Sequence, residues 1–213
     1  MAHVRYDNAA DWLHQLGDIP LERIIMDPAP GTATEADLQA FVERDKRLCE
    51  LIDGTLVEKP AGYLESLIAG WLLTELNVFI GSRNLGYVSG ADGMIRMISG
   101  RVRVPDVAFV SVHDLPGGVL PRDPIPTLPP TLAVEVLSET NTTAEIRQKL
   151  KEYFESGTKL AWIVDPVART IAVFEHFSEH PARVLRETDT LDGGSVLSGF
   201  HLEVSRLFDR LPQ

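Results

Sequence analysis

The sequence predicts an α/β or α+β fold in which helices flank a mixed central sheet. Two observations support this fold class. Short runs of β-branched and other apolar residues recur along the chain, and two longer segments, 63–80 and 141–156, carry apolar residues at helical spacing. These segments follow one another in the order helix, strands, helix, strand, which is typical of a sheet covered by helices.

The composition is that of an ordinary globular protein with one sizeable core. The chain has 213 residues, of which 44% are hydrophobic and 24% are charged. We expect residues 1–45 to form an N-terminal helical extension and residues 46–213 to form the main domain. A single cysteine, Cys49, excludes an internal disulfide framework and a thiolate zinc site.

Neither a secretory signal nor a membrane span is expected. Residues 1–10 are polar and lack the apolar centre of a signal peptide. The most apolar stretch, 67–73, is too short to cross a bilayer. Together with the lone cysteine, these features predict a cytoplasmic protein without a membrane partner.

The net charge of −11 argues against broad attraction to nucleic-acid backbones, which requires a basic surface. A local basic patch or a bound cation can still reverse the field near a site. Arg96, Arg101 and Arg103 are close in sequence and are candidates for such a patch. They are equally compatible with solvated positions on strands.

The first elements are predicted from capping and turn signals. Thr34 is a good N-cap for a helix that ends near Arg44, because its hydroxyl can accept a hydrogen bond from a free amide of the first turn. Asp53-Gly54 then separates two short apolar runs. Both positions of this pair tolerate positive φ, so a tight hairpin is expected over residues 48–58.

The segment 63–80 is the longest helical pattern. Ile68 and Leu72 belong to one broad apolar stripe along it. Two acids, Glu65 and Glu75, lie on the same stripe. Glu65 is in the first turn, where an acid also favours the helix dipole, so its position alone does not establish a functional role.

The centre of the chain is expected to supply the sheet. Strands 86–89 and 94–98 are predicted to pair, and a strand-like run follows at 102–110. The proline-rich segment 115–130 is expected to be a long loop that joins this run to strand 132–138 of the same sheet. Further elements are predicted after the helix 141–156: strands at 159–164, 170–177 and 183–187, and a short helix at 204–210.

Two acids on successive strands suggest a metal site. Asp106 follows Pro105, and Glu135 stands in the middle of an apolar run. A carboxylate in such a run is costly to bury unless something pairs with it. Strands adjacent in sequence are usually neighbours in space, so the two acids are expected to converge. Mg²⁺ prefers such oxygen ligands and often takes only one or two protein carboxylates.

A lysine on the following helix completes the set. Lys149 lies at the edge of the apolar stripe of segment 141–156, where its ammonium can reach into a cleft. Arg147 flanks the opposite edge, so the helical wheel does not choose between the two. Glu135 is also compatible with a purely structural ion pair to either of them.

Asp106, Glu135 and the displaced Lys149 resemble the PD-(D/E)xK nuclease superfamily. More closely, the chain resembles the bacterial restriction endonuclease family of the Uma-two type over roughly residues 34–208. The stretches that carry the resemblance are Glu50-Leu51-Ile52-Asp53-Gly54, Val104 to Ser111, Ala133 to Ser138, then Lys149, Tyr153 and Gly157, and Ala161 to Pro166.

This resemblance implies a restriction-endonuclease-like fold for residues 46–213 and Mg²⁺-dependent cleavage of DNA, with Mn²⁺ as a substitute metal. Asp106 and Glu135 are implied as catalytic metal ligands, Lys149 as the catalytic lysine, and Glu65 as a further metal ligand. Two features depart from the family pattern. Leu137 stands where the superfamily lysine normally lies, and many relatives carry histidine at the position of Glu65. Cleavage of both strands would favour a homodimer, although no interface pattern is visible.

Two other function classes stay open. One is a non-catalytic binding or regulatory protein on a nuclease-like fold, because a fold alone does not determine function. The other is a metal-dependent hydrolase of phosphoesters that are not nucleic acids. The geometry of Asp106 and Glu135 separates an enzyme from the first class, since acids that face opposite sides of the sheet cannot share a metal.

Overall fold

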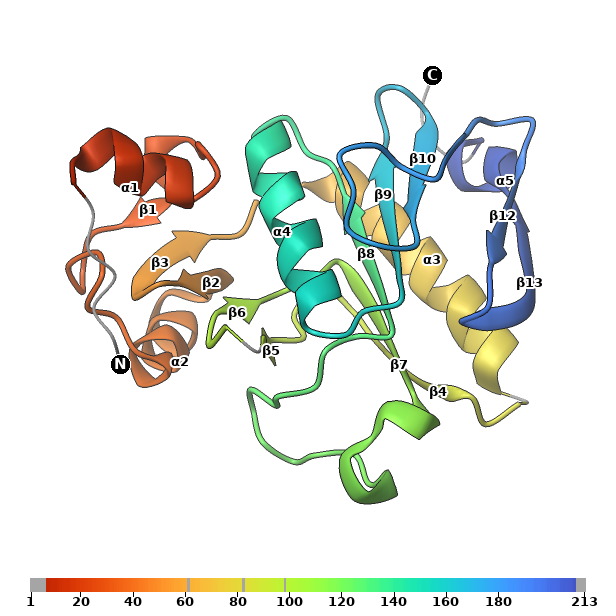
Figure 1. The fold of residues 1–213 in the computed structure, drawn as a ribbon, viewed down its shortest axis with the longest axis horizontal. Helices are drawn as coiled ribbons and strands as arrows, with labels where there is room; N and C mark the ends of the chain where they lie inside the picture. The colour runs from red at the N-terminus through yellow and green to blue at the C-terminus, as the bar shows by residue number, and fades with distance from the viewer. Residues whose placement is uncertain (1–6, 61, 82, 98, 210–213) are drawn as a thin grey trace.

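The computed structural model describes residues 7–60, 62–81, 83–97 and 99–209. Its strands form a six-stranded sheet in the order β11-β10-β9-β8-β7-β4, a five-stranded sheet in the order β1-β3-β2-β6-β5, and the pair β12-β13 (Figure 1). The strands are β1 (Ile24–Ile25), β2 (Cys49–Ile52), β3 (Thr55–Glu58), β4 (Gly86–Ser89), β5 (Ile95–Arg96), β6 (Val102–Arg103), β7 (Val107–Ser111), β8 (Leu132–Val136), β9 (Leu160–Asp165), β10 (Thr170–Phe174), β11 (Arg183–Leu185), β12 (Thr190–Gly193) and β13 (Leu197–Glu203). The α-helices are α1 (Ala9–Gln15), α2 (Glu35–Asp45), α3 (Tyr63–Gly81), α4 (Thr143–Glu155) and α5 (Val204–Phe208).

The six-stranded sheet is mixed, as the sequence predicts. β8 and β9 run parallel, because α4 connects them as a crossover, while β7 runs antiparallel to β8. The long proline-rich segment joins β7 to β8 within this sheet, which confirms that part of the prediction. The fold is therefore α+β with helices on a mixed sheet.

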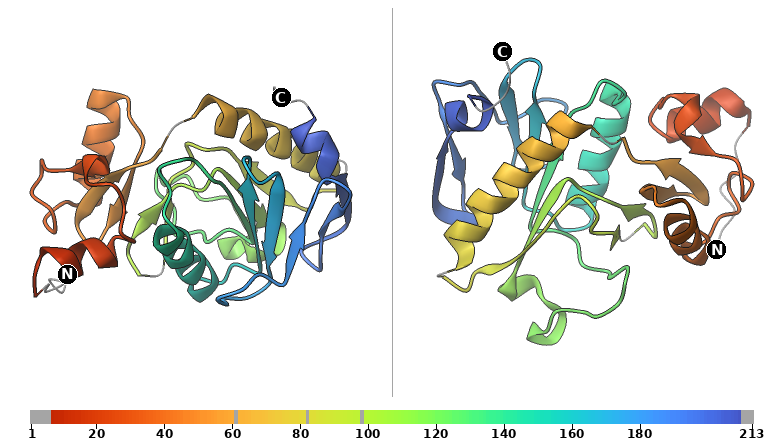
Figure 2. Two further views of the ribbon diagram at one scale, coloured as in Figure 1. Left: turned by 90° about the horizontal axis from the view of Figure 1, so that it is seen from above. Right: turned by 180° about the vertical axis from the view of Figure 1, so that it is seen from behind.

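The two faces of the central sheet are covered by different helices. Figure 2 shows α3 on one side and α4 on the other. Side chains alternate along β8: Leu132 and Val134 belong to the core beneath α3, whereas Ala133 packs in a cluster with Tyr153 of α4. Because Glu135 is one residue beyond Val134, the same alternation directs it towards α4.

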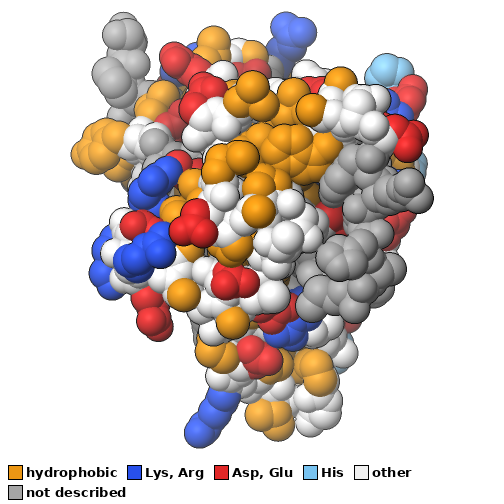
Figure 3. Space-filling model, turned by 90° about the vertical axis from the view of Figure 1, so that its left-hand side faces the viewer, with side chains coloured by type: hydrophobic (Ala, Val, Ile, Leu, Met, Phe, Trp, Pro, Cys, Tyr) orange, Lys and Arg blue, Asp and Glu red, His pale blue; other side chains and the backbone are white. Residues whose placement is uncertain are grey.

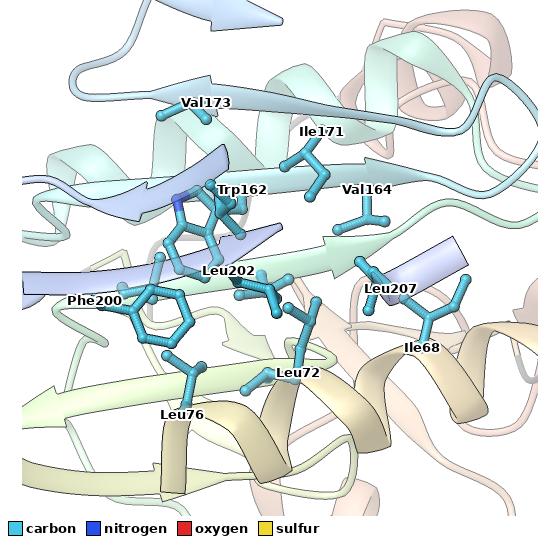
Figure 4. Close-up of a cluster of buried hydrophobic side chains, with 14 of the residues drawn as sticks. Ile68, Leu72, Leu76, Trp162, Val164, Ile171, Val173, Phe200, Leu202 and Leu207 are labelled. Carbon is cyan, nitrogen blue, oxygen red and sulfur yellow. The ribbon is translucent and has the colours of Figure 1, made fainter. Parts of the chain in front are cut away.

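The core beneath α3 is the largest hydrophobic cluster. Ile68, Leu72 and Leu76 of the helix pack towards Trp162 of β9 and Phe200 of β13 (Figure 4). These contacts confirm the apolar stripe predicted for residues 63–80. By length and composition α3 could also cross a membrane, and core helices pass the same test. The buried stripe of α3 packs into this core, while other positions of the helix, such as Val78, are exposed.

Local sequence signals predict two features in the region of the smaller sheet, the start of α2 and the turn between β2 and β3. The Thr34 side chain accepts a hydrogen bond from the backbone of Asp37, and the Asp37 carboxylate accepts one from the backbone of Thr34, which makes a capping box at α2. Asp53 and Gly54 have φ values of 48° and 76°, as the predicted hairpin turn requires. Both local predictions are confirmed.

Two strand predictions are wrong. β4 pairs with β7 in the central sheet, and the segment after it supplies β5 to the other sheet, so the predicted pairing of 86–89 with 94–98 does not occur. The run 102–110 is two strands, β6 and β7, that belong to different sheets. Long-range pairing decides both outcomes, and apolar patterning does not report it.

Three features bear on the remaining predictions. Residues 1–45 include β1, which pairs with β3, in addition to helices, and the predicted division at residue 45 stays a prediction. The pair β12-β13 is an element that the sequence patterns did not indicate. The predicted final helix is α5, and residues 98 and 210 of the predicted segments lie outside the described part of the chain.

Candidate active site

The predicted site residues line one small cavity at the carboxyl end of β8. Glu65, Asp106, Glu135 and Lys149 all contribute to its wall, although they come from α3, the β6–β7 connection, β8 and α4. The cavity measures about 20 Å³ and is thus close to the space that one water molecule requires. Asp106 and Glu135 therefore face the same side of the sheet.

Asp106 is held against β8 by backbone hydrogen bonds. Its own amide donates to the carbonyl of Val134 at 3.0 Å, and its Oδ2 accepts a hydrogen bond from the amide of Val136 at 2.7 Å. The side chain is 13% exposed. Asp106 therefore stands at the crossing between the two sheets with its carboxylate directed at the end of β8.

Glu135 is buried and fully paired. Its Oε2 lies 3.0 Å from Nζ of Lys149, and its Oε1 accepts a hydrogen bond from the hydroxyl of Tyr153. Lys149 and Tyr153 are four residues apart on α4, so one face of the helix supplies both partners. The structure thus selects Lys149 over Arg147, which is exposed and pairs with Glu179.

The charged groups around Glu135 shift one another's pKa values. Burial raises the pKa of Glu135; the neighbouring Lys149 opposes this, and Asp106 adds to it. Burial would lower the pKa of Lys149, but Glu135 and Glu50 outweigh burial and raise it above its usual range. Lys149 therefore stays charged at any working pH and holds Glu135 in place as an ion pair.

Glu50 joins this cluster and extends it. Its Oε1 lies 3.2 Å from Nζ of Lys149, and its Oε2 lies 2.7 Å from a guanidinium nitrogen of Arg103. Arg103 also pairs with Glu152 of α4 at 2.7 Å. Burial would raise the pKa of Glu50, but Lys149 and Arg103 lower it to about 2. Glu50 therefore faces the buried cluster and links β2 to α4.

The three arginines considered as a basic patch are paired with acids. Arg103 is buried against Glu50 and Glu152, Arg101 pairs with Asp53 and Glu152, and Arg96 lies 2.6 Å from Glu35. The patch interpretation and the solvated-strand interpretation are both wrong for Arg103. On the face of the molecule seen in Figure 3, basic side chains also stand beside acidic ones and form no continuous basic surface.

Glu65 reaches the cavity from the first turn of α3. A side chain at position 62 would collide with the Glu65 carboxylate, so glycine at this position leaves the carboxylate room to lie against the backbone. Glu75, on the same helix, instead lies 3.6 Å from Arg206 and is outside the cavity. The two acids of the α3 stripe therefore have different environments.

Lys59 is a residue of the cavity that sequence patterns did not single out. It follows β3 directly, it is 7% exposed, and its Nζ lies 2.8 Å from Oδ1 of Asp106. The same ammonium donates to the carbonyl of Ala91 at 3.3 Å. A lysine directly after a strand of buried residues was the available signal, because burial of a lysine requires a partner.

The acids of the cavity match a hard cation in donor type. Carboxylate oxygens are the ligands that Mg²⁺ prefers, and Asp106, Glu135 and Glu65 supply them from three elements. Within the described part of the chain, no three acidic, histidine or cysteine side chains are already arranged around one point. In this structure Lys59 forms an ion pair with Asp106, and Lys149 forms one with Glu135. The metal-binding and catalytic roles stay predictions.

A family model described as Uma2, "Putative restriction endonuclease", matches residues 35–205. The chain belongs to the Uma2 family. The resemblance drawn from Asp106, Glu135 and the flanking motifs is thereby confirmed at the level of the family. No match was found among curated protein sequences.

A solved structure supports the same fold. The crystal structure of a putative nuclease belonging to DUF820 from Anabaena variabilis ATCC 29413 is similar to this Uma2 chain, with a TM-score of 0.67. The match covers 77% of this chain and 91% of that chain at 20% sequence identity. At this identity the likeness shows the fold, which is that expected of a restriction-endonuclease-like protein.

Proposed function

We propose that this Uma2-family chain is a metal-dependent endonuclease that hydrolyses phosphodiester bonds in DNA. The observation that supports the proposal most is the shared cavity. Asp106, Glu135 and Glu65 come from three different elements, and two buried lysines stand beside them. An ion pair that served only stability would not require acids from three elements to border one open space.

Asp106, Glu135 and Glu65 are the residues that would hold Mg²⁺ or Mn²⁺. When bound, such an ion polarises a phosphoryl oxygen and makes a water molecule nucleophilic near neutral pH. The chain contributes rigidity to this arrangement. The Val136 amide fixes the Asp106 carboxylate, and Tyr153 and Lys149 fix that of Glu135.

The two lysines have different parts in this proposal. Lys149 lies between Glu135 and Glu50, so its charge is already balanced and it acts as a positioning residue. Lys59 forms its ion pair with Asp106, lies close enough to act on Glu135, and borders the cavity. Its ammonium is therefore the group placed to stabilise negative charge that develops on a phosphate at the mouth of the cavity.

The test is cleavage of supercoiled plasmid by the purified full chain with Mg²⁺ or Mn²⁺, with EDTA as the metal-free control. We expect nicked and linear products from the wild-type protein and none from Asp106→Asn. Glu75→Gln is the control, since Glu75 is a partly exposed acid that pairs with Arg206 outside the cavity. Cleavage that persists in Asp106→Asn, or in EDTA, would refute the proposal.

One observation favours a second candidate, a non-catalytic DNA-binding or regulatory protein. Asp106 and Glu135 each already have a lysine partner, which is the arrangement of a closed structural network. The same assay separates the candidates. A protein that binds DNA but leaves plasmid intact with either metal would support this second candidate and contradict the first.

A further inference from the structure

A second and much larger cavity adjoins the carboxylate cavity. It has a volume of about 310 Å³, which lies in the range of small-molecule sites. Ser138 and Asn141 line both cavities. The two spaces therefore open on either side of these two side chains, at the point where β8 ends and α4 begins.

The inner wall of this cavity is apolar and includes an aromatic ring. Leu137, Ile146, Leu150 and Phe174 form it, and the same four residues pack together between α4 and the central sheet. Phe174 is 8% exposed, so little of its surface remains accessible. A wall of this kind accepts a flat apolar group and gives no hydrogen bond to an ion.

The rim of the cavity is polar and carries both signs of charge. Arg147 donates to Glu179 at 2.6 Å, and both side chains are more than half exposed, at 56% and 69%. A guanidinium has five N–H donors, so this ion pair leaves donors for a ligand. The Glu179 carboxylate is an acceptor, and Thr143 adds a hydroxyl at the same rim.

We infer that this cavity is a nucleobase subsite that receives an unstacked base of the nucleic acid whose phosphate lies at the mouth of the carboxylate cavity. A nucleobase has apolar faces and an edge of donors and acceptors, which matches the apolar wall and the mixed rim. One deoxyribose links a base to its phosphate, and Ser138 and Asn141 line both cavities. Enzymes that act on nucleic acid bind unstacked bases in such pockets. This inference rests on the proposed function.

The position of the subsite predicts a preference for strands with an accessible base. A base within an intact duplex must leave the stack before it can enter a pocket, and this step is less costly at a mismatch or in a single strand. The acidic net charge is consistent with this mode, because recognition of one base requires less contact with the phosphate backbone than binding along a duplex.

The test compares two small ligands by NMR titration of the ¹⁵N-labelled full chain without divalent metal. One ligand is a 2′-deoxynucleoside 5′-monophosphate and the other is 2-deoxyribose 5-phosphate, which lacks the base. We expect the nucleotide to bind the wild-type protein at least about tenfold more tightly, because its base buries apolar surface against the wall of the cavity. Equal affinity for the two ligands, or no binding of any nucleotide, would overturn the inference.

A pocket-filling variant makes the test specific. Thr143→Trp places a large ring at the rim and should weaken nucleotide binding by about tenfold. Lys151→Trp, an exposed position of the same helix outside the cavity, should leave nucleotide binding unchanged. Equal thermal unfolding temperatures of both variants and the wild type establish that each is folded. Unchanged nucleotide binding in a folded Thr143→Trp would contradict the subsite.

The two proposals fail in different ways. A wild-type protein that cleaves DNA but binds no nucleotide through this cavity retains the proposed function and loses the subsite. A protein that binds nucleotides as expected, and in which Asp106→Asn preserves that binding, has the subsite whether or not plasmid is cleaved. Absence of cleavage in that case counts only against the endonuclease.

Discussion

The ammonium of Lys59 lies 2.8 Å from Oδ1 of Asp106, at the junction of the two sheets. Asp106 is also bound through its second carboxylate oxygen to the Val136 amide of β8. The pair therefore connects the end of β3 to the end of β8, beside the cavity that Glu65 and Glu135 border. Lys59 thus forms an ion pair with Asp106 and also acts on the charge of Glu135.

Removal of the Lys59 charge should reduce DNA cleavage without unfolding the protein. Lys59→Met retains the length of the side chain but not the ammonium, and loss of one such electrostatic partner typically costs about 10²- to 10³-fold in rate. The measurement is the plasmid cleavage rate at saturating metal. Lys151→Met, on the solvent side of α4, is the control and should cleave normally. Normal cleavage by Lys59→Met would exclude Lys59 from the site.

Lys149 should be more important for stability than Lys59. Lys149→Met leaves Glu135 and Glu50 buried without their shared cation, and breaking a buried ion pair costs about 3–5 kcal/mol. The free energy of unfolding in urea measures this loss. Lys151→Met should change the same quantity by less than about 0.5 kcal/mol. A change in Lys149→Met as small as that of the control would contradict the buried network.

The lowered pKa of Glu50 should account for part of the stability that the protein loses at acid pH. Burial would raise this pKa, but the neighbours Lys149 and Arg103 lower it to about 2 in the folded state, against an ordinary value of 4.5. A carboxyl whose folded pKa is depressed stabilises the fold above its unfolded pKa, and this contribution is lost as the pH falls from 4.5 towards 2. The contribution is about 3 kcal/mol. In Glu50→Gln the free energy of unfolding should therefore fall less steeply over this pH window. An unchanged slope would contradict the assignment.

Cys49 should be unreactive until the protein unfolds. It is fully buried in β2, and burial raises the pKa of its thiol to about 12. The thiolate is the reactive form, so reaction with a disulfide reagent at pH 8 should be slow in the native protein and fast in urea. The absorbance of the released thiol measures both rates. Rapid reaction under native conditions would show that β2 opens more readily than its burial implies.

Local signals in the sequence predicted much of the fold. The Thr34 cap, the Asp53-Gly54 turn and the apolar stripe of α3 each depend on neighbours within a few residues, and the structure has all three. Strand partners were harder to predict. β4 and β5 are close in sequence but belong to different sheets, because their partners are distant segments of the chain.

The sequence predicted the acids of the candidate site but not all of the residues that pair with them. Asp106 and Glu135 were visible as carboxylates at a strand end and inside a strand. The ion pairs of Lys59 with Asp106 and of Glu50 with Lys149 form only because the fold places β2 and β3 against β8 and α4, and sequence patterns do not report this contact. Helical spacing left Arg147 and Lys149 as equal candidates, and burial of Lys149 beside Glu135 distinguishes them.

The most direct test of the central claim is Mn²⁺ binding to the purified full chain, measured by electron paramagnetic resonance of the free ion. We expect saturable binding to the wild-type protein, loss of this binding in Asp106→Asn, weakened binding in Glu65→Gln, and unchanged binding in Glu75→Gln, whose acid lies outside the cavity. The account is contradicted if the wild-type protein shows no saturable binding, or if Asp106→Asn binds Mn²⁺ as tightly as the wild type.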